Sequence, residues 1–254
     1  MDYRECIEYF HLLFCNRLAS KVDRNFFSLK GGCNLRFYFQ SIRYSEDIDF
    51  DVHTTSLQTL KKNVEKILND ENFLSILKHE NIEITEWSAS KQTETTQRWK
   101  VSLKISDQAL SVPTKIEFSR RSGKFEFSEI KYVTPSLISK YRLQPVLLQH
   151  YNLMGAIEQK IHALINRTET QARDVIDLKI LTDQQSTSHI FKISPKDKAK
   201  ALEALTAISF DQFKSQVWPF LLNEFQEFYK SEPAWNETQD KVFNFIQKQL
   251  MEEP

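Results

Sequence analysis

Residues 29–52 read LKGGCNLRFYFQSIRYSEDIDFDV, a Gly-Gly pair behind an apolar segment and alternating acids near the end. Residues 26–29 are predicted to form a short strand, Gly31 and Gly32 a tight turn, and residues 34–40 a helix. A further strand carrying the acids follows. This order of strand, turn, helix and acidic strand decides the fold of the N-terminal part of the chain.

The alternating acids of this stretch predict a metal site. Residues two apart in a strand face the same way, so Asp47 and Asp49 present both carboxylates on one side while Ile48 and Phe50 point into the core. Two ionised carboxylates repel each other unless a cation such as Mg²⁺ neutralises them. The first turn of the preceding helix exposes backbone N–H groups that can cradle phosphate. Together these features indicate phosphoryl or nucleotidyl transfer.

Two blocks of the sequence carry a family resemblance. A Gly-Gly turn, a spacer of about a dozen residues and Asp-hydrophobic-Asp-hydrophobic resemble the signature of the nucleotidyltransferase superfamily related to DNA polymerase β. GGCNLR followed by RYSEDIDFD is similar to the AbiEii/AbiGii-type toxins of that superfamily. Residues 158–178, EQKIHALINRTETQARDVIDL, resemble the later motif of these toxins, a helical lysine before Arg-Asp-x-x-Asp.

The resemblance implies a set of site residues. Lys160 and Asp177 are carried over as active-site members beside Asp47 and Asp49. Cys33 stands where family members often carry a hydroxyl residue that contacts phosphate, and a thiol is a weaker donor. The expected nucleotide-binding residues are Gly31, Gly32, Cys33, Arg36, Arg43, Lys160, Arg173 and Asp174.

A third carboxylate is expected on a strand beside the Asp47 strand. Glu117, within the β-prone residues 114–119, is the first candidate, and Glu83 is the competitor. Asp47, Asp49 and Glu117 would hold one or two Mg²⁺ ions, ~4 Å apart if two, with Mn²⁺ as a possible substitute.

The periodicity of apolar residues predicts an α+β fold in two domains. Residues 1–135 are expected to form a nucleotidyltransferase domain, a mixed β-sheet flanked by helices, and residues 136–254 a helical bundle that completes the nucleotide and substrate cleft. Expected helices are 5–19, 57–69, 153–165, 174–181, 196–208, 210–228 and 241–250, and expected strands are 82–89, 99–105 and 114–119.

Composition narrows the class of protein. Basic and acidic residues balance at 34 each in 254 residues, so contact with RNA requires a local basic patch. Three cysteines without metal-ligand spacing favour a reducing cytoplasm over a disulfide framework. The charged start MDYRECIEYFHLL is unlike a signal peptide, and apolar runs are too short to span a membrane.

The working hypothesis is an Mg²⁺-dependent nucleotidyltransferase that binds an NTP and transfers NMP to an acceptor. By resemblance the acceptor is RNA, such as a tRNA 3′ end, and the enzyme is a toxin with a separately encoded antitoxin. Two alternatives remain open. One is a metal-dependent nuclease using Asp47, Asp49, Glu117 and Lys115, and the other is a noncatalytic protein that binds nucleotide or a partner protein.

Overall fold

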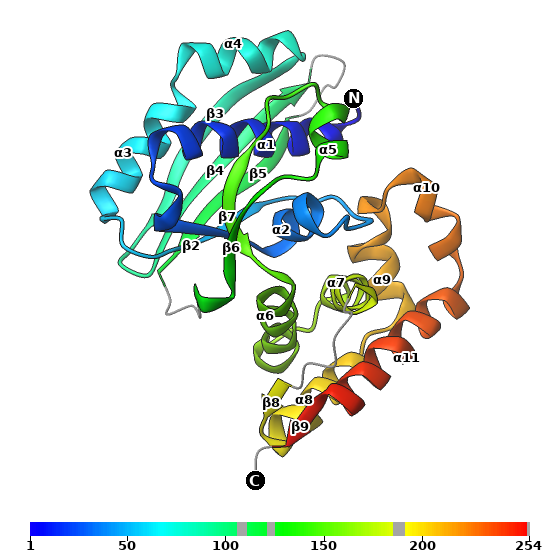
Figure 1. Ribbon diagram of the computed structural model, residues 1–254. Coiled ribbons are helices and arrows are strands. Elements are labelled where there is room, and N and C mark those ends of the chain that lie inside the picture. The colour runs from blue at the N-terminus through cyan, green and yellow to red at the C-terminus, as the bar shows by residue number, and fades with distance from the viewer. Residues whose placement is uncertain (106–110, 121–124, 185–190, 253–254) are drawn as a thin grey trace. The chain divides into compact units, whose positions relative to one another are not determined.

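The computed structural model describes residues 1–105, 111–120, 125–184 and 191–252, and the chain divides into two compact units (Figure 1). The N-terminal unit comprises Met1–Gln40 and Tyr44–Asn152. The C-terminal unit comprises Ser41–Arg43 and Leu153–Pro254. A short segment from early in the chain therefore belongs with the C-terminal unit.

The N-terminal unit combines strands and helices as the sequence predicts. Its strands are β1 (Phe27–Lys30), β2 (Ile48–Val52), β3 (Ile82–Gln92), β4 (Thr96–Ile105), β5 (Val112–Ser119), β6 (Ser128–Tyr132) and β7 (Leu147–Tyr151). Its helices are α1 (Tyr3–Lys21), α2 (Gly31–Tyr38), α3 (Leu57–Leu68), α4 (Glu71–His79) and α5 (Pro135–Lys140), with short 3₁₀ turns at Arg24–Phe26 and Phe125–Phe127.

These strands form one mixed seven-stranded sheet in the order β3-β4-β5-β2-β1-β7-β6. The pairs β2 with β5 and β1 with β7 are parallel, and the other four neighbouring pairs are antiparallel. The acidic strand β2 lies in the middle of the sheet between β5 and β1. β2 pairs with β1 over residues 49–52 and with β5 over residues 48–51, so the backbone of Asp49 is held on both sides, and Asp47 directly precedes the strand.

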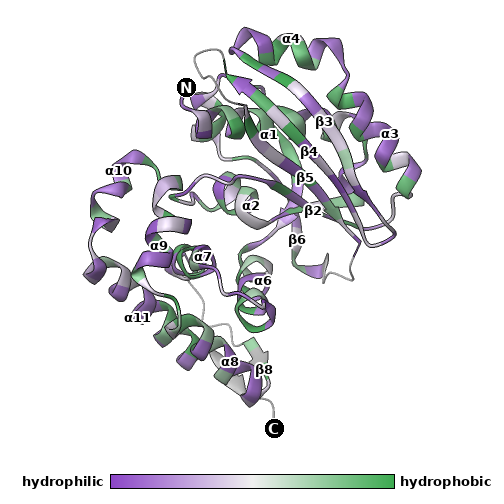
Figure 2. Ribbon diagram, turned by 180° about the vertical axis from the view of Figure 1, so that it is seen from behind, coloured by the Kyte–Doolittle hydropathy of each residue, from purple (hydrophilic) through white to green (hydrophobic). Residues whose placement is uncertain are grey.

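Helices cover one face of this sheet. Helix α1 begins with a capping box, in which Asp2 accepts from the Glu5 amide and the Glu5 carboxylate accepts from the Asp2 amide. Phe10 and Phe14 of α1 are fully buried in the core that α1, α3 and α4 form against β3 and β4. The opposite face of β3, β4 and β5 has no helix in front of it (Figure 2).

The sheet continues past the expected end of the first domain. Strands β6 and β7 and helix α5 lie in the N-terminal unit, which extends to Asn152 instead of residue 135. Strand β7 was not predicted because residues 147–151, LLQHY, are too few for their periodicity to be distinguished from that of a helix. Helix α4 was also not predicted, although Asp70 caps it through the Phe73 amide.

The C-terminal unit is mainly helical. Its elements are α6 (Leu153–Asn166), α7 (Ala172–Asp183), β8 (Phe191–Ile193), α8 (Pro195–Thr206), α9 (Phe210–Gln216), α10 (Asn223–Gln226), α11 (Glu232–Gln249) and β9 (Leu250–Glu252). The single helix expected over 210–228 is wrong. Helix α9 ends at Gln216, and a 3₁₀ turn at Trp218–Phe220 follows, because Pro219 has no amide hydrogen to continue an α-helix. Across the described residues, the helices are all too short or too polar to span a membrane.

Candidate active site

Asp49 and Glu117 are direct neighbours in the sheet. Strands β2 and β5 pair in parallel with Asp49 opposite Glu117, and the pairs on either side, Ile48 with Ile116 and Phe50 with Phe118, are fully buried. The apolar pairs fix the register, and a shift by one residue would turn every side chain to the other face. The core therefore places these two carboxyl groups side by side on the sheet face opposite to the helices.

The electrostatic surroundings of Asp49 are unfavourable for its negative charge. The pKa of Asp49 is raised from 3.8 to about 6, first because the carboxylate is removed from water. The negative charges of Asp47 and Glu117 raise this pKa further, while the positive charges of Lys30 and Lys115 lower it. A bound cation would relieve this repulsion.

Cations of the chain itself hold the other two acids. Lys115 Nζ lies 2.8 Å from Asp47 Oδ2, and Arg98 Nε lies 2.6 Å from Glu117 Oε2. Within the described residues no three His, Cys, Asp or Glu side chains converge closely enough to hold a metal ion. The structure thus brings the three expected acids to one region of the sheet but turns two of them toward Lys115 and Arg98.

Gly31 brings the backbone of α2 against Asp49. Gly31 has φ +68°, and a Cβ atom built on it would lie 3.0 Å from Asp49 Oδ2. Gly31 begins the helix instead of forming a separate turn, so α2 starts three residues earlier than the expected 34–40. Lys30 occupies the N-cap position, and among the described side chains it makes no capping hydrogen bond. The first-turn N–H groups therefore have no side-chain cap.

Lys30 and Asp51 are two charged residues beside the acids that the sequence analysis missed. Lys30 donates to Asp51 Oδ1, and the Tyr151 hydroxyl donates to Asp51 Oδ2 at 2.7 Å. Asp51 is buried two residues after Asp49, on the same side of β2. The continued alternation of acids at 47, 49 and 51 was the signal that could have found it.

Cys33 lies in the core, where it does not face a ligand. Its side chain is 1% exposed, and its Sγ lies 3.3 Å from the Asp47 carbonyl oxygen and 3.4 Å from His11 Nδ1. Burial raises the pKa of the thiol well above its ordinary value. The expected phosphate contact through the Cys33 side chain is therefore corrected to a packing contact that supports the backbone before β2.

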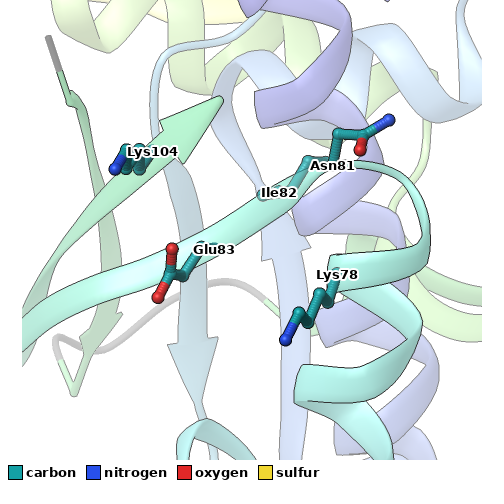
Figure 3. A pocket seen from close by; sticks show the side chains of 5 residues that line it. All are labelled: Lys78, Asn81, Ile82, Glu83 and Lys104. Atoms are coloured by element: carbon teal, nitrogen blue, oxygen red, sulfur yellow. The ribbon is translucent and has the colours of Figure 1, made fainter. Parts of the chain in front are cut away.

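Two other expected residues lie away from the acids. Arg36 Nε lies 2.6 Å from Glu8 Oε1, in a largely buried ion pair that also receives a hydrogen bond from the Tyr141 hydroxyl. Glu83 lies on β3 opposite Lys104, two strands beyond β5. There it lines a small surface pocket with Lys78 and Lys104 (Figure 3).

The C-terminal unit contains a buried charge network on α6 and α7. Lys160 Nζ lies 2.9 Å from Asp174 Oδ1 and 2.6 Å from Asp177 Oδ2. Arg43 donates through Nε and Nη2 to both oxygens of Asp177, at 2.8 and 2.7 Å. Arg167 Nε lies 2.9 Å from the second oxygen of Asp174.

These contacts set the charge state of Asp177. Burial alone would raise the pKa of Asp177, but Arg43 and Lys160 outweigh it and hold the pKa at about 2. Arg173, an expected nucleotide-binding residue, is half-buried, and the described residues offer it no ion-pair partner. Lys160, Asp174 and Asp177 therefore form one network with Arg43, and Arg173 stands outside it.

Comparison with known protein families decides the assignment. A model of the nucleotidyl transferase AbiEii toxin family, from type IV toxin–antitoxin systems, matches residues 11–251. The chain belongs to this family. It is therefore a nucleotidyltransferase of the AbiEii toxin type, as the resemblance of the two sequence blocks implied. No curated protein matches it significantly.

Solved structures share the fold of this AbiEii-family chain at low sequence identity. MenT4, a nucleotidyltransferase toxin from Mycobacterium tuberculosis H37Rv, is 16% identical with a TM-score of 0.65, over 96% of this chain and 84% of that one. A putative nucleotidyltransferase from H. pylori is 18% identical with a TM-score of 0.62, over 98% of both chains. JHP933 from Helicobacter pylori is 18% identical with a TM-score of 0.61, over 98% and 95%. These matches confirm the expected fold class.

Proposed function

We propose that the chain transfers NMP from an NTP to an RNA acceptor in an Mg²⁺-dependent reaction at the acids of β2 and β5. The observation that carries the proposal is the pairing of Asp49 with Glu117 next to the Gly31 backbone. The carboxylate oxygens of this pair are hard ligands that suit a divalent cation. The uncapped N-terminus of α2 beside them suits a phosphate.

The residues present fit a magnesium ion chemically. Asp47, Asp49 and Glu117 supply carboxylate oxygens. The pKa of Asp49 is raised first by burial and then by the charges of Asp47 and Glu117, and a cation would neutralise those charges. Asp47 and Glu117 would exchange Lys115 and Arg98 for the ion. Bound there, Mg²⁺ would offset the charge of the triphosphate and of the leaving pyrophosphate. Mn²⁺ has the same ligand preference and would substitute for it.

The other expected residues have roles around the nucleotide. The first turn of α2, at Gly31 and Gly32, would donate backbone N–H groups to the phosphates. By family resemblance Lys160 and Asp177 are assigned to the active site, and Arg173 and Asp174 to nucleotide binding. Arg43, which precedes the acids in the chain, is a further proposed phosphate contact. In the reaction an acceptor hydroxyl oxygen bonds to the α-phosphorus, the bond from that phosphorus to the β-phosphate oxygen breaks, pyrophosphate leaves with the electron pair, and the hydroxyl proton passes to water.

Membership of a toxin family suggests what the reaction would do in a cell. An acceptor such as tRNA, once extended, would no longer serve translation, and a separately encoded antitoxin would limit this effect in the cytoplasm. The proposal that the C-terminal unit completes the nucleotide site follows from the family motif carried by α6 and α7.

A labelling experiment tests the proposal. Purified protein is incubated with Mg²⁺, each α-³²P-labelled NTP and total RNA, and the products are separated on a denaturing gel beside those of Asp49→Asn. We expect label in a tRNA-sized band with the wild type alone. Shortened RNA would instead support the nuclease, and unlabelled, intact RNA with every NTP would contradict transfer to RNA and favour a binding role.

A further inference from the structure

The open face of the sheet carries a row of basic residues beside the acids. We define the basic strip as Lys91 of β3, Arg98, Lys100 and Lys104 of β4, and Lys115 of β5. Lys91 lies opposite Arg98, and Lys100 lies opposite Lys115. The side chains of β4 at alternate positions share one face, so Arg98, Lys100 and Lys104 point the same way. The strip is therefore a continuous feature of three neighbouring strands.

The other face of β4 explains why the strip points to solvent. Trp99, Val101 and Leu103 alternate with the basic residues and are at most 1% exposed, because they pack into the core beneath α1. Lys100 and Lys104 are exposed on the opposite face, where Figure 2 shows β3, β4 and β5 without a covering helix. The sheet thus sets the spacing of the backbone positions that carry these charges.

Most of the strip is not neutralised by the protein. Lys91, Lys100 and Lys104 are exposed, and no described acidic side chain forms an ion pair with any of them. Like charges directly opposite each other in a sheet are destabilising, which applies to Lys100 and Lys115. Glu83 and Glu86 lie on the same face of β3, opposite Lys104 and Ser102, so the strip is most basic near Lys100 and Lys115.

We propose that the basic strip binds the phosphodiester backbone of the nucleic acid that the enzyme extends. This inference rests on the proposed function, because it requires a nucleic acid acceptor. Six residues of extended strand separate Arg98 from Lys104, about 20 Å, enough to follow several phosphates. The strip begins at the acids themselves, where Lys115 pairs with Asp47 and Arg98 with Glu117, and β4 lies two strands, about 10 Å, from Asp49.

The position of the strip favours a nucleic acid over an acidic protein. An acceptor strand whose end lies at Asp49 must continue over the neighbouring surface, and β5 and β4 are the next strands on one side. The phosphates of a strand that crosses β5 and β4 would contact the lysines of the strip and would not be repelled by the acids. An acidic protein held at the same place would cover the carboxylates that the reaction needs. Since the whole chain has no net charge, such a local strip is the way to attract RNA.

Binding measurements on two triple variants test this inference. The first replaces the unpaired lysines of the strip, as Lys91→Gln, Lys100→Gln and Lys104→Gln in the full chain. The matched control makes the same charge change on α3, which packs with α1 and α4, as Lys61→Gln, Lys62→Gln and Lys66→Gln. Fluorescence anisotropy measures the Kd for labelled tRNA, and for a single-stranded RNA and DNA of one sequence, over a range of salt concentrations without NTP or Mg²⁺.

We expect the strip variant to bind tRNA about ten- to a hundredfold more weakly at low salt. The slope of log Kd against log salt should fall by about 2, since each lost phosphate contact removes about 0.7 to 0.9. RNA and DNA should respond alike, because phosphate contacts do not depend on the sugar. The α3 control should bind as the wild type does.

Two results would overturn the inference. One is equal binding by the strip variant and the α3 control, and the other is a loss confined to RNA, which would show that the sugar or base is recognised instead of the phosphates. The binding test of the strip and the labelling test of nucleotide transfer can fail independently. Binding that depends on the strip without any nucleotide transfer would refute the transfer reaction alone, and transfer with unchanged binding would refute the strip alone.

Discussion

Gly31 and Asp49 approach so closely that a Cβ atom on Gly31 would lie 3.0 Å from Asp49 Oδ2. Gly31 also has φ +68°, a conformation that L residues with a side chain adopt at a cost. The glycine thus serves two purposes at once. It lets β1 turn directly into α2, and it leaves the space beside the carboxylate open.

Gly31→Ala is therefore expected to damage both stability and catalysis. The left-handed conformation costs about 1–2 kcal/mol for alanine, which lowers Tm by about 2–8 °C. The methyl group also pushes the Asp49 carboxylate away by a few tenths of an ångström. Since a displacement of about 1 Å costs about 100-fold in rate, the rate of transfer should fall by less than that. Calorimetry and the labelling assay measure the two effects.

Gly32→Ala is the matched control for stability. Gly32 follows within α2 and does not have a positive φ, so alanine there favours the helix. Its Tm should equal or exceed that of the wild type. If Gly31→Ala were as stable as Gly32→Ala, the left-handed conformation of Gly31 would not exist in solution.

Asp49→Asn should make the metal-free protein more stable. The folded-state pKa of about 6 lies above the ordinary value of 3.8, so the stability that the neutral carboxyl contributes is lost as pH rises through 6. This difference between the two pKa values corresponds to at most about 3 kcal/mol in the free energy of unfolding. Urea unfolding should show the gain at pH 8 and little of it at pH 4, while nucleotide transfer is abolished.

The same substitution two residues later should have the opposite effect on stability. Asp51 is buried and accepts from Lys30 and Tyr151, so Asp51→Asn leaves the ammonium group without its carboxylate. We expect this variant to be less stable than the wild type at pH 8. A loss of stability in Asp49→Asn as well would show that Asp49 is not electrostatically strained.

The local pattern predicted strands at Asp49 and at Glu117, and both strands are present. Asp47 lies one residue before β2, so its common face with Asp49 stays a prediction. The register that sets Asp49 opposite Glu117 is not local. It depends on how Phe50 and Phe118 stack in the core, and a sequence pattern does not contain that packing.

Contacts between distant residues account for most of what the sequence could not predict. Arg43 was expected at the nucleotide because it precedes the acids in the chain. The sequence pattern did not show its partner Asp177, 134 residues away. Likewise, Cys33 follows the glycines but points into the core toward His11. Neighbourhood in sequence suggests a role near the nucleotide, and only the fold shows which partner each side chain has.

Arg43→Ala should destabilise the C-terminal unit. The variant leaves the buried Asp177 carboxylate with Lys160 as its remaining cation, and breaking a buried pair costs about 3 kcal/mol or more. Hydrogen exchange of the α7 amides should therefore accelerate, while exchange in β2 and β5 stays unchanged. Lys179→Ala, which breaks the partly exposed pair with Asp183, should cost at most about 1 kcal/mol. Equal rates of α7 amide exchange in both variants would contradict the stabilising role assigned to Arg43.

Mild acid should weaken the N-terminal unit through His11. The side chain is fully buried, and its removal from water lowers its pKa from 6.5 to about 3. Its Nε2 lies 2.8 Å from Thr114 Oγ1, and Thr114 in turn donates to the Glu46 carbonyl beside Asp47. Between pH 6.5 and about 3 the unfolded chain binds a proton that the folded chain does not, so stability falls with falling pH.

Comparison of His11→Gln with His79→Gln isolates this effect. One such histidine changes the free energy of unfolding by about 1.4 kcal/mol per pH unit. The pKa of Asp49 is shifted in the opposite direction, so Asp49 offsets part of this slope in the wild type. Urea unfolding between pH 6 and 4 should show a slope for His11→Gln that is smaller by about this amount. His79 is exposed on α4, and its variant should keep the slope of the wild type. Identical slopes in all three proteins would contradict the lowered pKa and would mean that His11 is protonated in the fold, where both ring nitrogens would donate, to Thr114 Oγ1 and to Cys33 Sγ.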